Sequence, residues 1–149
     1  MPTTGPDAGC LDAGRRWRGE PLDAANLILR RPEEADIPAL VSLAGDWEVA
    51  RHTAFIPHPY SEEDARTFIA EAPNQAADGA HVVFAIERRT EPGLIGYAGL
   101  IIDGDGAEIG YWIGQPFWGQ GFAGEAVRRL LRLAFDVLGL ERVRAEILS

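Results

Sequence analysis

The chain has 149 residues, 46% of them apolar, so it can bury a core of ordinary size and fits one domain. Its formal net charge of −9 opposes a phosphate backbone as the main partner, so we expect no direct nucleic-acid contact and a preference for cationic molecules such as amines. No apolar run approaches the ~20 residues of a membrane-spanning helix, and no apolar stretch follows a basic start, so we expect a cytoplasmic protein without membrane attachment.

Cysteine and lysine usage excludes further chemistries. Cys10 is the single cysteine, and no Cys or His stands near it at ligand spacing, so we expect neither a metal site nor a redox pair. All 14 basic residues are arginine, which removes Schiff-base chemistry on a lysine.

The first 25 residues differ in composition from the rest. They mix Gly, Pro, Ala and charged residues without a period of 2 or 3.6, so we expect residues 1–25 to form a flexible extension. The remaining residues, 26–149, are expected to form the folded domain.

Two helices are predicted before the main sheet. A short strand is expected from Asn26 to Arg31, followed by a helix from Glu33 to Ala44 whose start is left open by Pro38. A capping-box-like pair, Ser61 and Asp64, predicts the start of a second helix that runs to Ala72.

Three apolar segments rich in β-branched and aromatic residues predict strands joined by short turns. Short connections imply antiparallel neighbours. The segments run from His81 to Glu87, from Leu94 to Ile102 and from Ala107 to Ile113.

The last part of the chain is predicted to continue from a strand into a helix and then into a final strand. From Ala123 to Leu138 apolar residues, Phe135 among them, recur at helical spacing, and Gly139 is a predicted C-cap. The alternation from Arg142 to Leu148 predicts a last strand. The fold class is therefore α+β, with helices packed on a sheet.

The segment from Ala107 to Glu125 carries the chemistry. A strand ends, and a loop with Gly119 and Gly121 leads directly into the amphipathic helix. Unpaired N–H groups at such a helix start, with the positive end of the helix dipole behind them, bind phosphate or diphosphate.

Two cofactors fit a glycine loop of this kind. Gly119, Gly121 and Gly124 spell G-x-G-x-x-G, the dinucleotide fingerprint, with Glu141 or Glu146 near the distance of a ribose-binding acid. This alternative is disfavoured because Gln115, Pro116, Phe117 and Trp118 intervene before Gly119, and because an antiparallel hairpin precedes the glycine loop.

The second interpretation is a resemblance to the GNAT superfamily of N-acetyltransferases. Residues 118–123 (WGQGFA) resemble its [Q/R]-x-x-G-x-[G/A] motif, and the run P-x-W-G-x-G-x-A-x-E-A at residues 116–126 is typical of the RimJ/RimL branch. The resemblance runs from about residue 26 to the end. Further similar phrases are LILR (27–30), ADIPAL (35–40), PHPYSEEDARTFI (57–69), EIGYWI (108–113) and AFDVLGLERVRAEI (134–147).

This resemblance implies a mixed, mostly antiparallel twisted sheet and acetyl-CoA as co-substrate. The pantetheine arm is expected to pair with the main chain of Trp112 and Ile113, where an N–H would also support the thioester oxygen. The diphosphate is expected on the backbone N–H groups of the loop: Trp118, Gly119, Gln120, Gly121, Phe122 and Ala123.

The acceptor is expected to be a primary amine, either a protein N-terminus or a small molecule. Glu108 is the candidate base that removes its proton, although a strand carboxylate paired with an arginine is an equally simple interpretation. The resemblance also suggests that His52, His58 and Tyr60 shape the acceptor pocket.

Members of the family extend beyond the strand that ends near Leu148, with a further helix and strand. We therefore expect this chain to lack those C-terminal elements and the general acid, to have weak turnover alone, and to expose a sheet edge suited to a homodimer. A non-catalytic CoA-binding or interaction module is the alternative function.

Overall fold

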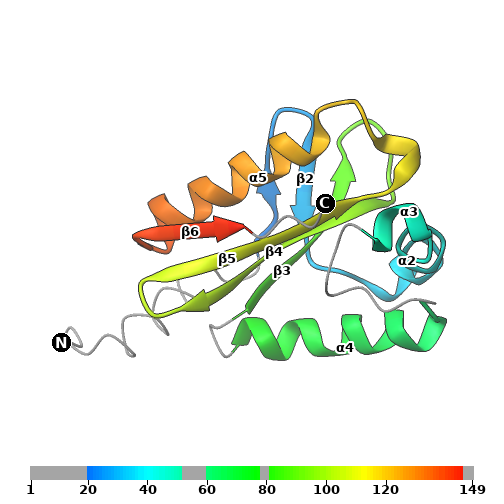
Figure 1. Cartoon of the computed structure of the whole chain (residues 1–149), viewed down its shortest axis with the longest axis horizontal. Helices are drawn as coiled ribbons and strands as arrows, with labels where there is room; N and C mark the ends of the chain where they lie inside the picture. Colours follow the sequence, from blue (N-terminus) through cyan, green and yellow to red (C-terminus); the bar gives the residue numbers. More distant parts are fainter. Residues whose placement is uncertain (1–19, 52–59, 78–80, 146–149) are drawn as a thin grey trace.

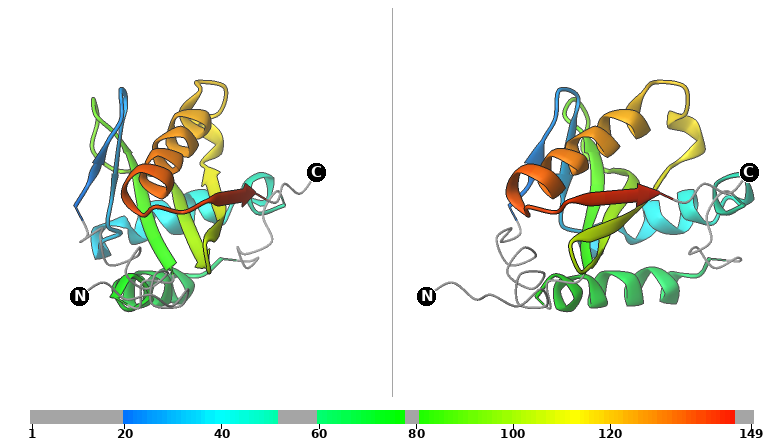
Figure 2. Two further views of the ribbon diagram at one scale, coloured as in Figure 1. Left: turned by 90° about the vertical axis from the view of Figure 1, so that its left-hand side faces the viewer. Right: turned by 60° about the vertical axis from the view of Figure 1, so that its left-hand side comes forward.

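The computed structural model describes residues 20–51, 60–77 and 81–145, which form an α+β fold around one six-stranded sheet (Figure 1). Neighbouring strands from β1 to β5 are antiparallel, whereas β6 runs parallel to β5. The strands lie in chain order: β1 (Leu22–Asp23), β2 (Leu27–Arg30), β3 (His81–Arg88), β4 (Leu94–Asp103), β5 (Gly106–Ile113) and β6 (Arg142–Ala145). The expected mixed, mostly antiparallel sheet is confirmed, and Figure 2 shows its twist.

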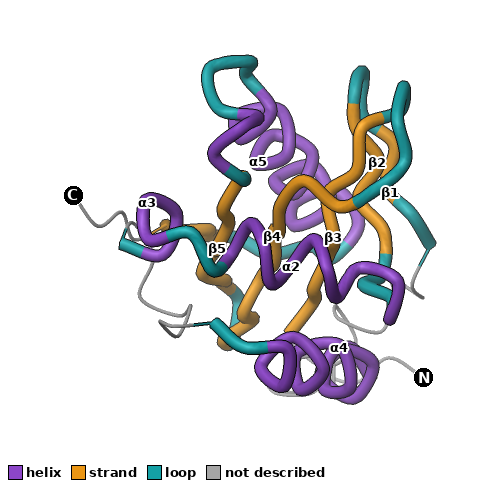
Figure 3. The backbone as a smooth tube through the Cα atoms, turned by 90° about the vertical axis from the view of Figure 1, so that its right-hand side faces the viewer, coloured by secondary structure: helices purple, strands orange, loops and turns teal. Residues whose placement is uncertain are grey.

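Helices cover both faces of the sheet. On one face lie α2 (Ile37–Ala44), α3 (Trp47–Ala50) and α4 (Glu62–Ala77), and on the other lies α5 (Phe122–Arg132) (Figures 1 and 3). Each face has its own apolar cluster. Leu130, Phe84 and Leu100 belong to the cluster beneath α5, and Leu40 and Trp112 belong to the cluster beneath α2 and α4.

The central strands β3, β4 and β5 are buried on both faces over most of their length. Their side chains alternate between the two clusters because successive Cβ atoms of a strand point to opposite faces. In β5, Ile109 and Ile113 therefore join the α5 cluster, while Trp112 joins the α2 cluster. Strand β4 pairs with β5 along the whole length of β5, so this hairpin forms the centre of the sheet.

This topology excludes the dinucleotide alternative. A dinucleotide fold needs a parallel sheet around its glycine loop, whereas β5 and β6 are the one parallel pair among the described strands. Among the described residues, no helix is long and apolar enough to cross a membrane.

Helix α5 keeps its predicted apolar stripe but ends differently from the prediction. Ala126, Leu130 and Ala134 are buried, yet Phe135 is 44% exposed. The reason is a π-helical turn, η3 (Leu133–Val137), in which the amide of Leu138 donates to the carbonyl of Leu133 five residues earlier. The wider turn rotates Phe135 out of the core.

The first half of the chain corrects two expectations. Leu22, inside the predicted flexible extension, is buried and pairs with Leu29, so the sheet begins at β1 rather than near residue 26. A single apolar side chain in a polar stretch leaves no periodic pattern, which is why the prediction missed it. The predicted first helix divides into a 3₁₀ turn, η1 (Glu34–Asp36), and α2, which accepts Pro38 because it lies in the first turn.

The capping box at the second helix is confirmed. The amide of Asp64 donates to Ser61 Oγ at 3.1 Å, and the amide of Ser61 donates to Asp64 Oδ2 at 2.9 Å. Helix α4 extends beyond the predicted end at Ala72 to Ala77, and the single helical turn α3 was not predicted.

A buried ion pair joins β2, β3 and the start of α2. Asp36 is 3% exposed and accepts two bonds from Arg30, at 2.8 and 2.9 Å, and one from the amide of Glu33 at 2.7 Å. Glu87 in β3 also accepts from Arg30, at 3.2 Å. The hydrogen bonds that Arg30 donates to Asp36, and then the negative charge of Asp36, raise the pKa of Arg30 above its already high usual range. The arginine therefore stays charged.

We predict that Asp36→Asn lowers the free energy of unfolding by about 2 kcal/mol, because charge-assisted bonds to Arg30 are lost at a buried position. Chemical denaturation monitored by circular dichroism measures this. Glu34→Gln, an exposed carboxylate in the same turn, is the matched control and should change the value by less than about 0.5 kcal/mol. Equal effects of the two substitutions would contradict the prediction.

Candidate active site

The two neighbours of β5 pair with it over different lengths. Strand β4 pairs with β5 from Gly106 to Ile113, but the described pairing with β6 runs only from Gly106 to Ile109. In Figure 1 the described part of β6 lies beside the first half of β5 and the second half continues past it. The main chain from Gly110 to Ile113 lies beyond the described part of the pairing with β6.

The register of the hairpin tells which main-chain groups of β5 face that side. The amide of Gly114 donates to the carbonyl of Ile95 at 2.8 Å, so groups at every second residue before it also face β4. Trp112 is one of these: a Cβ added at Gly96 in β4 would lie 2.3 Å from its carbonyl oxygen. The N–H and C=O groups of Tyr111 and Ile113 consequently face away from β4.

This result changes one expected role. The main chain of Trp112 is directed at β4 and is not available to a ligand, whereas the N–H and C=O groups of Ile113 face away from β4 and its carbonyl accepts from Trp118 Nε1 at 2.6 Å. Tyr111 was missed by the sequence analysis, although alternation along the strand pairs it with Ile113 rather than with Trp112. Alternation could have identified it once the hairpin register was known.

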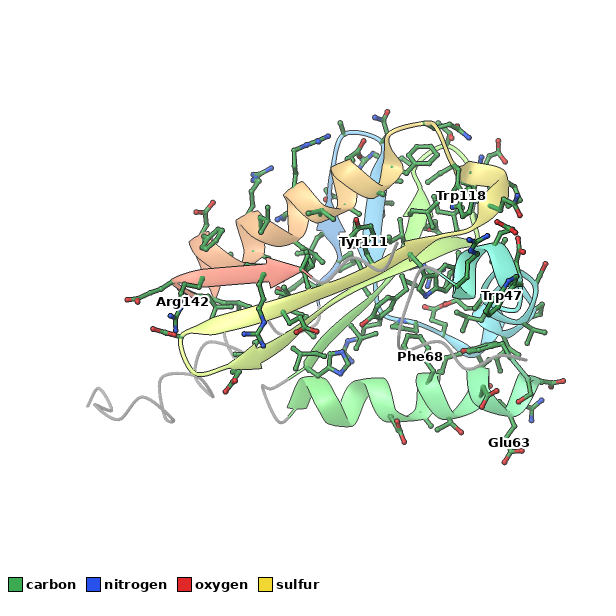
Figure 4. The ribbon with its side chains drawn as sticks, viewed as in Figure 1. Trp47, Glu63, Phe68, Tyr111, Trp118 and Arg142 are labelled. Carbon is green, nitrogen blue, oxygen red and sulfur yellow. The ribbon has the colours of Figure 1, made fainter. Side chains whose placement is uncertain are left out.

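A short 3₁₀ turn, η2 (Gln115–Phe117), leads from β5 into the glycine loop. The indole Nε1 of Trp118 donates to the carbonyl of Ile113 at 2.6 Å and so ties the loop to the end of β5. The backbone amide of Trp118 donates to the carbonyl of Gln115 at 3.1 Å. Its amide is therefore occupied, which differs from the expectation, and its side chain anchors the loop instead (Figure 4).

The next residues have the conformation that an anion-binding loop requires. Gly119 and Gly121 have φ angles of +79° and +82°, and a Cβ at either position would meet nothing within 4 Å. A residue with a side chain is strained in this region, so glycine is needed for the backbone and not for space.

Helix α5 starts directly after Gly121, and no side chain caps it. Its first amides, from Phe122 to Gly124, have no partners within the helix because the ladder begins with Glu125, which donates to the carbonyl of Gly121 at 3.1 Å. A helix start with this geometry and dipole binds anions. Helical geometry directs these amides at the space beyond the start of α5.

A long-range clamp holds the first turn of α5. Glu125 accepts from the amide of Asn26 at 2.7 Å and from its side-chain Nδ2 at 2.9 Å. One turn later Arg129 Nε donates to the carbonyl of Asp23 at 2.8 Å. These contacts explain Glu125 in the motif: it binds the helix to the start of β2.

Glu108 lies on the other face of the sheet, in a row of side chains that crosses four strands. The register places His81, Ile101, Glu108 and Arg144 side by side, one each from β3, β4, β5 and β6. Arg144 Nε donates to Glu108 Oε2 at 3.4 Å, and the Glu108 side chain is 34% exposed. The carboxylate thus has the arginine partner of the simpler interpretation and also retains access to solvent.

Two glycines adjoin this row. Gly99 and Gly110 are directly opposite each other in β4 and β5, so no side chain rises between Glu108 and Trp112 on β5. Tyr97 leans over Gly99, where a Cβ would lie 2.5 Å from its hydroxyl oxygen, and that hydroxyl is 3.4 Å from His81 Nε2. Burial lowers the pKa of His81 and raises that of Tyr97, so both are neutral at pH 7.

The expected acceptor residues are only partly within the described chain. Tyr60 is half-buried at the start of α4 and packs against the α2 cluster. Burial and then the charge of Asp64 raise its pKa to about 12, so it remains a neutral hydroxyl. His52 and His58 lie outside the described residues. Trp47 is 55% exposed on α3 (Figure 4).

Comparisons with known proteins agree with this arrangement. The family model for the acetyltransferase (GNAT) domain matches residues 26–149. The uncharacterized N-acetyltransferase p20 of Bacillus licheniformis is 33% identical over 131 residues, covering 86% of this chain and 73% of p20.

Solved structures share the fold. RimJ of Mycobacterium smegmatis, in complex with CoA-disulfide, has a TM-score of 0.71 at 21% identity over 86% of this chain and 66% of its own. RimL, a ribosomal L7/L12 α-N-protein acetyltransferase in complex with CoA, has a TM-score of 0.64 at 23% identity over 75% of this chain and 66% of its own. The family match and the relative, together with the uncapped helix start after the glycine loop, lead to one conclusion: the chain belongs to the GNAT acetyltransferase family and is an acetyl-CoA-dependent N-acetyltransferase.

Proposed function

We propose that the diphosphate of acetyl-CoA binds the backbone amides of the loop and of the first turn of α5, at Gly119, Gln120, Gly121, Phe122 and Ala123. The observation that carries this proposal is the uncapped start of α5, which follows two glycines with positive φ in a loop bonded to the end of β5. Trp118 contributes through its indole, which holds the loop on Ile113.

The pantetheine arm then follows β5 as a strand would, bonded to the main chain of Tyr111 and Ile113. This assignment replaces Trp112, whose main chain faces β4. The N–H of Tyr111 or Ile113 supports the negative charge that develops on the thioester oxygen. Trp112 contributes its side chain to the opposite face.

The acceptor is a primary amine, and we infer that it is a protein N-terminus. RimL, which shares the fold, is named for α-amino acetylation of a ribosomal protein, and the net charge of −9 favours a cationic acceptor. His52, His58 and Tyr60 line its pocket in this proposal, and a small-molecule amine is the alternative acceptor.

Glu108 acts as the base in the proposed reaction. It takes a proton from the acceptor ammonium, directly or through a water, and the free amine attacks the thioester carbonyl carbon. The C–N bond forms, the C–S bond breaks and CoA leaves as a thiolate, which takes up the proton that the attacking nitrogen loses as the amide forms. The exposed part of the Glu108 side chain and the glycine pair beside it support this role.

Release of free thiol from acetyl-CoA in the presence of a peptide with a free N-terminus tests the proposed function. The same peptide with an acetylated N-terminus is the control acceptor. Thiol release with the free peptide alone is the expected result. CoA binding without turnover on peptides or small amines would select the non-catalytic module instead.

We predict that Gly121→Ala weakens CoA binding by about tenfold, because alanine in the left-handed region costs about 1–2 kcal/mol and draws the loop out of shape. Isothermal titration calorimetry with CoA measures the Kd. Gly104→Ala is the matched control, since Gly104 also has positive φ (+64°) with open space around it but lies in the β4–β5 turn. An equal loss with both variants would show that the strain acts on the whole fold.

We predict that Glu108→Gln lowers kcat by about 100-fold or more and leaves the Kd for CoA unchanged, because only proton removal is lost. Steady-state thiol release and calorimetry measure the two quantities. Arg144→Met breaks the same ion pair from the other side and serves for comparison. If the carboxylate is merely an ion-pair partner, the two variants should lose activity equally.

A further inference from the structure

Arg88, the last residue of β3, lies beside the start of the glycine loop although it is 30 positions away from Trp118 in the chain. Its guanidinium carbon is 4.7 Å from the centre of the Phe117 ring, the geometry of a cation–π contact. Its Nη2 donates to Glu91 in the β3–β4 turn at 3.1 Å.

The guanidinium of Arg88 is held in place by the contact of its flat face with the Phe117 ring rather than by its hydrogen bonds. Its Nε is buried and has no hydrogen-bond partner among the described residues. Its ion-pair partner Glu91 has a side chain that is 65% exposed, so this pair is weak. A buried donor without a partner destabilises the fold, so the stacking on Phe117 is the contact that accounts for the position of Arg88.

Phe117 connects this contact to the loop. It closes η2 and is followed at once by Trp118, whose indole is bonded to the end of β5. The loop is therefore anchored at two adjacent residues, one on β5 and one on β3. Its far side is anchored by Asn26 and Glu125. Between these anchors only Gly119 to Gly124 are left to follow a ligand.

We propose that Arg88 is a positioning residue for the acetyl donor: by stacking on Phe117 it holds the glycine loop in the shape that receives the diphosphate. The inference rests on the proposed donor site. Arg88 acts through Phe117 and touches neither the reacting thioester nor the acceptor. The planar guanidinium suits this role because it stacks on the ring and reaches Glu91 at the same time.

The test compares Arg88→Met with Arg89→Met, the adjacent arginine, whose side chain pairs with the exposed Asp23 in β1. The Kd for CoA is measured by calorimetry and the Kd for pantetheine, which lacks the diphosphate, by NMR titration. Arg88→Met is expected to raise the Kd for CoA about fivefold to tenfold and to leave that for pantetheine unchanged. Arg88→Lys should restore part of the affinity, and Arg89→Met should match the wild type.

Phe117→Leu provides a second route if Arg88→Met fails to fold, because leucine fills similar space without a π face. Phe117→Leu should raise the Kd for CoA as Arg88→Met does. In the double variant with Phe117→Leu, Arg88→Lys should not raise the Kd for CoA any further. The inference is overturned if CoA and pantetheine weaken equally, or if the Arg88 and Phe117 variants bind CoA like Arg89→Met. A wild-type protein that binds CoA no more tightly than pantetheine would instead refute the proposed donor site.

Discussion

The unequal pairing of β5 is the constraint on which the rest of the site depends. Strand β4 satisfies one side of β5 from end to end, while the described pairing with β6 stops at Ile109. Backbone N–H and C=O groups within a folded domain require partners. Those of Tyr111 and Ile113 face away from β4, and in the proposed site an extended ligand supplies partners for some of them. The chain leaves this strand directly into the glycine loop.

The loop has its shape because its ends are held. Trp118 bonds to the end of β5, Phe117 lies against Arg88 of β3, and Glu125 accepts from Asn26 directly before β2. Three strands of the sheet thus hold one short segment. Rigid anchors lower the entropy that a loop loses on binding, so an open loop with held ends is a better anion site than a mobile one.

The sheet separates the two halves of the proposed chemistry. Side chains at Ile109 and Ile113 pack under α5, while Glu108 and Trp112 alternate onto the face covered by α2 and α4. A donor held along the edge of β5 can thus meet an acceptor approaching on the Glu108 face. Gly99 and Gly110 add no side chains to that part of the sheet face. A side chain at Gly99 would collide with Tyr97.

The sequence by itself determined the α+β class, the antiparallel hairpins, the helix after the glycines and the need for glycine at Gly119 and Gly121. Those features follow from local periodicity and backbone sterics, which can be read within about ten residues. Only the tertiary structure decided that the main chain of Trp112 faces β4 while that of Tyr111 faces away, that the Trp118 amide is occupied, and that Phe135 is exposed. Only it brought Asn26 to Glu125 and Arg88 to Phe117, because hairpin register and contacts between distant segments arise when the sheet and helices pack, and leave no periodic trace in the chain.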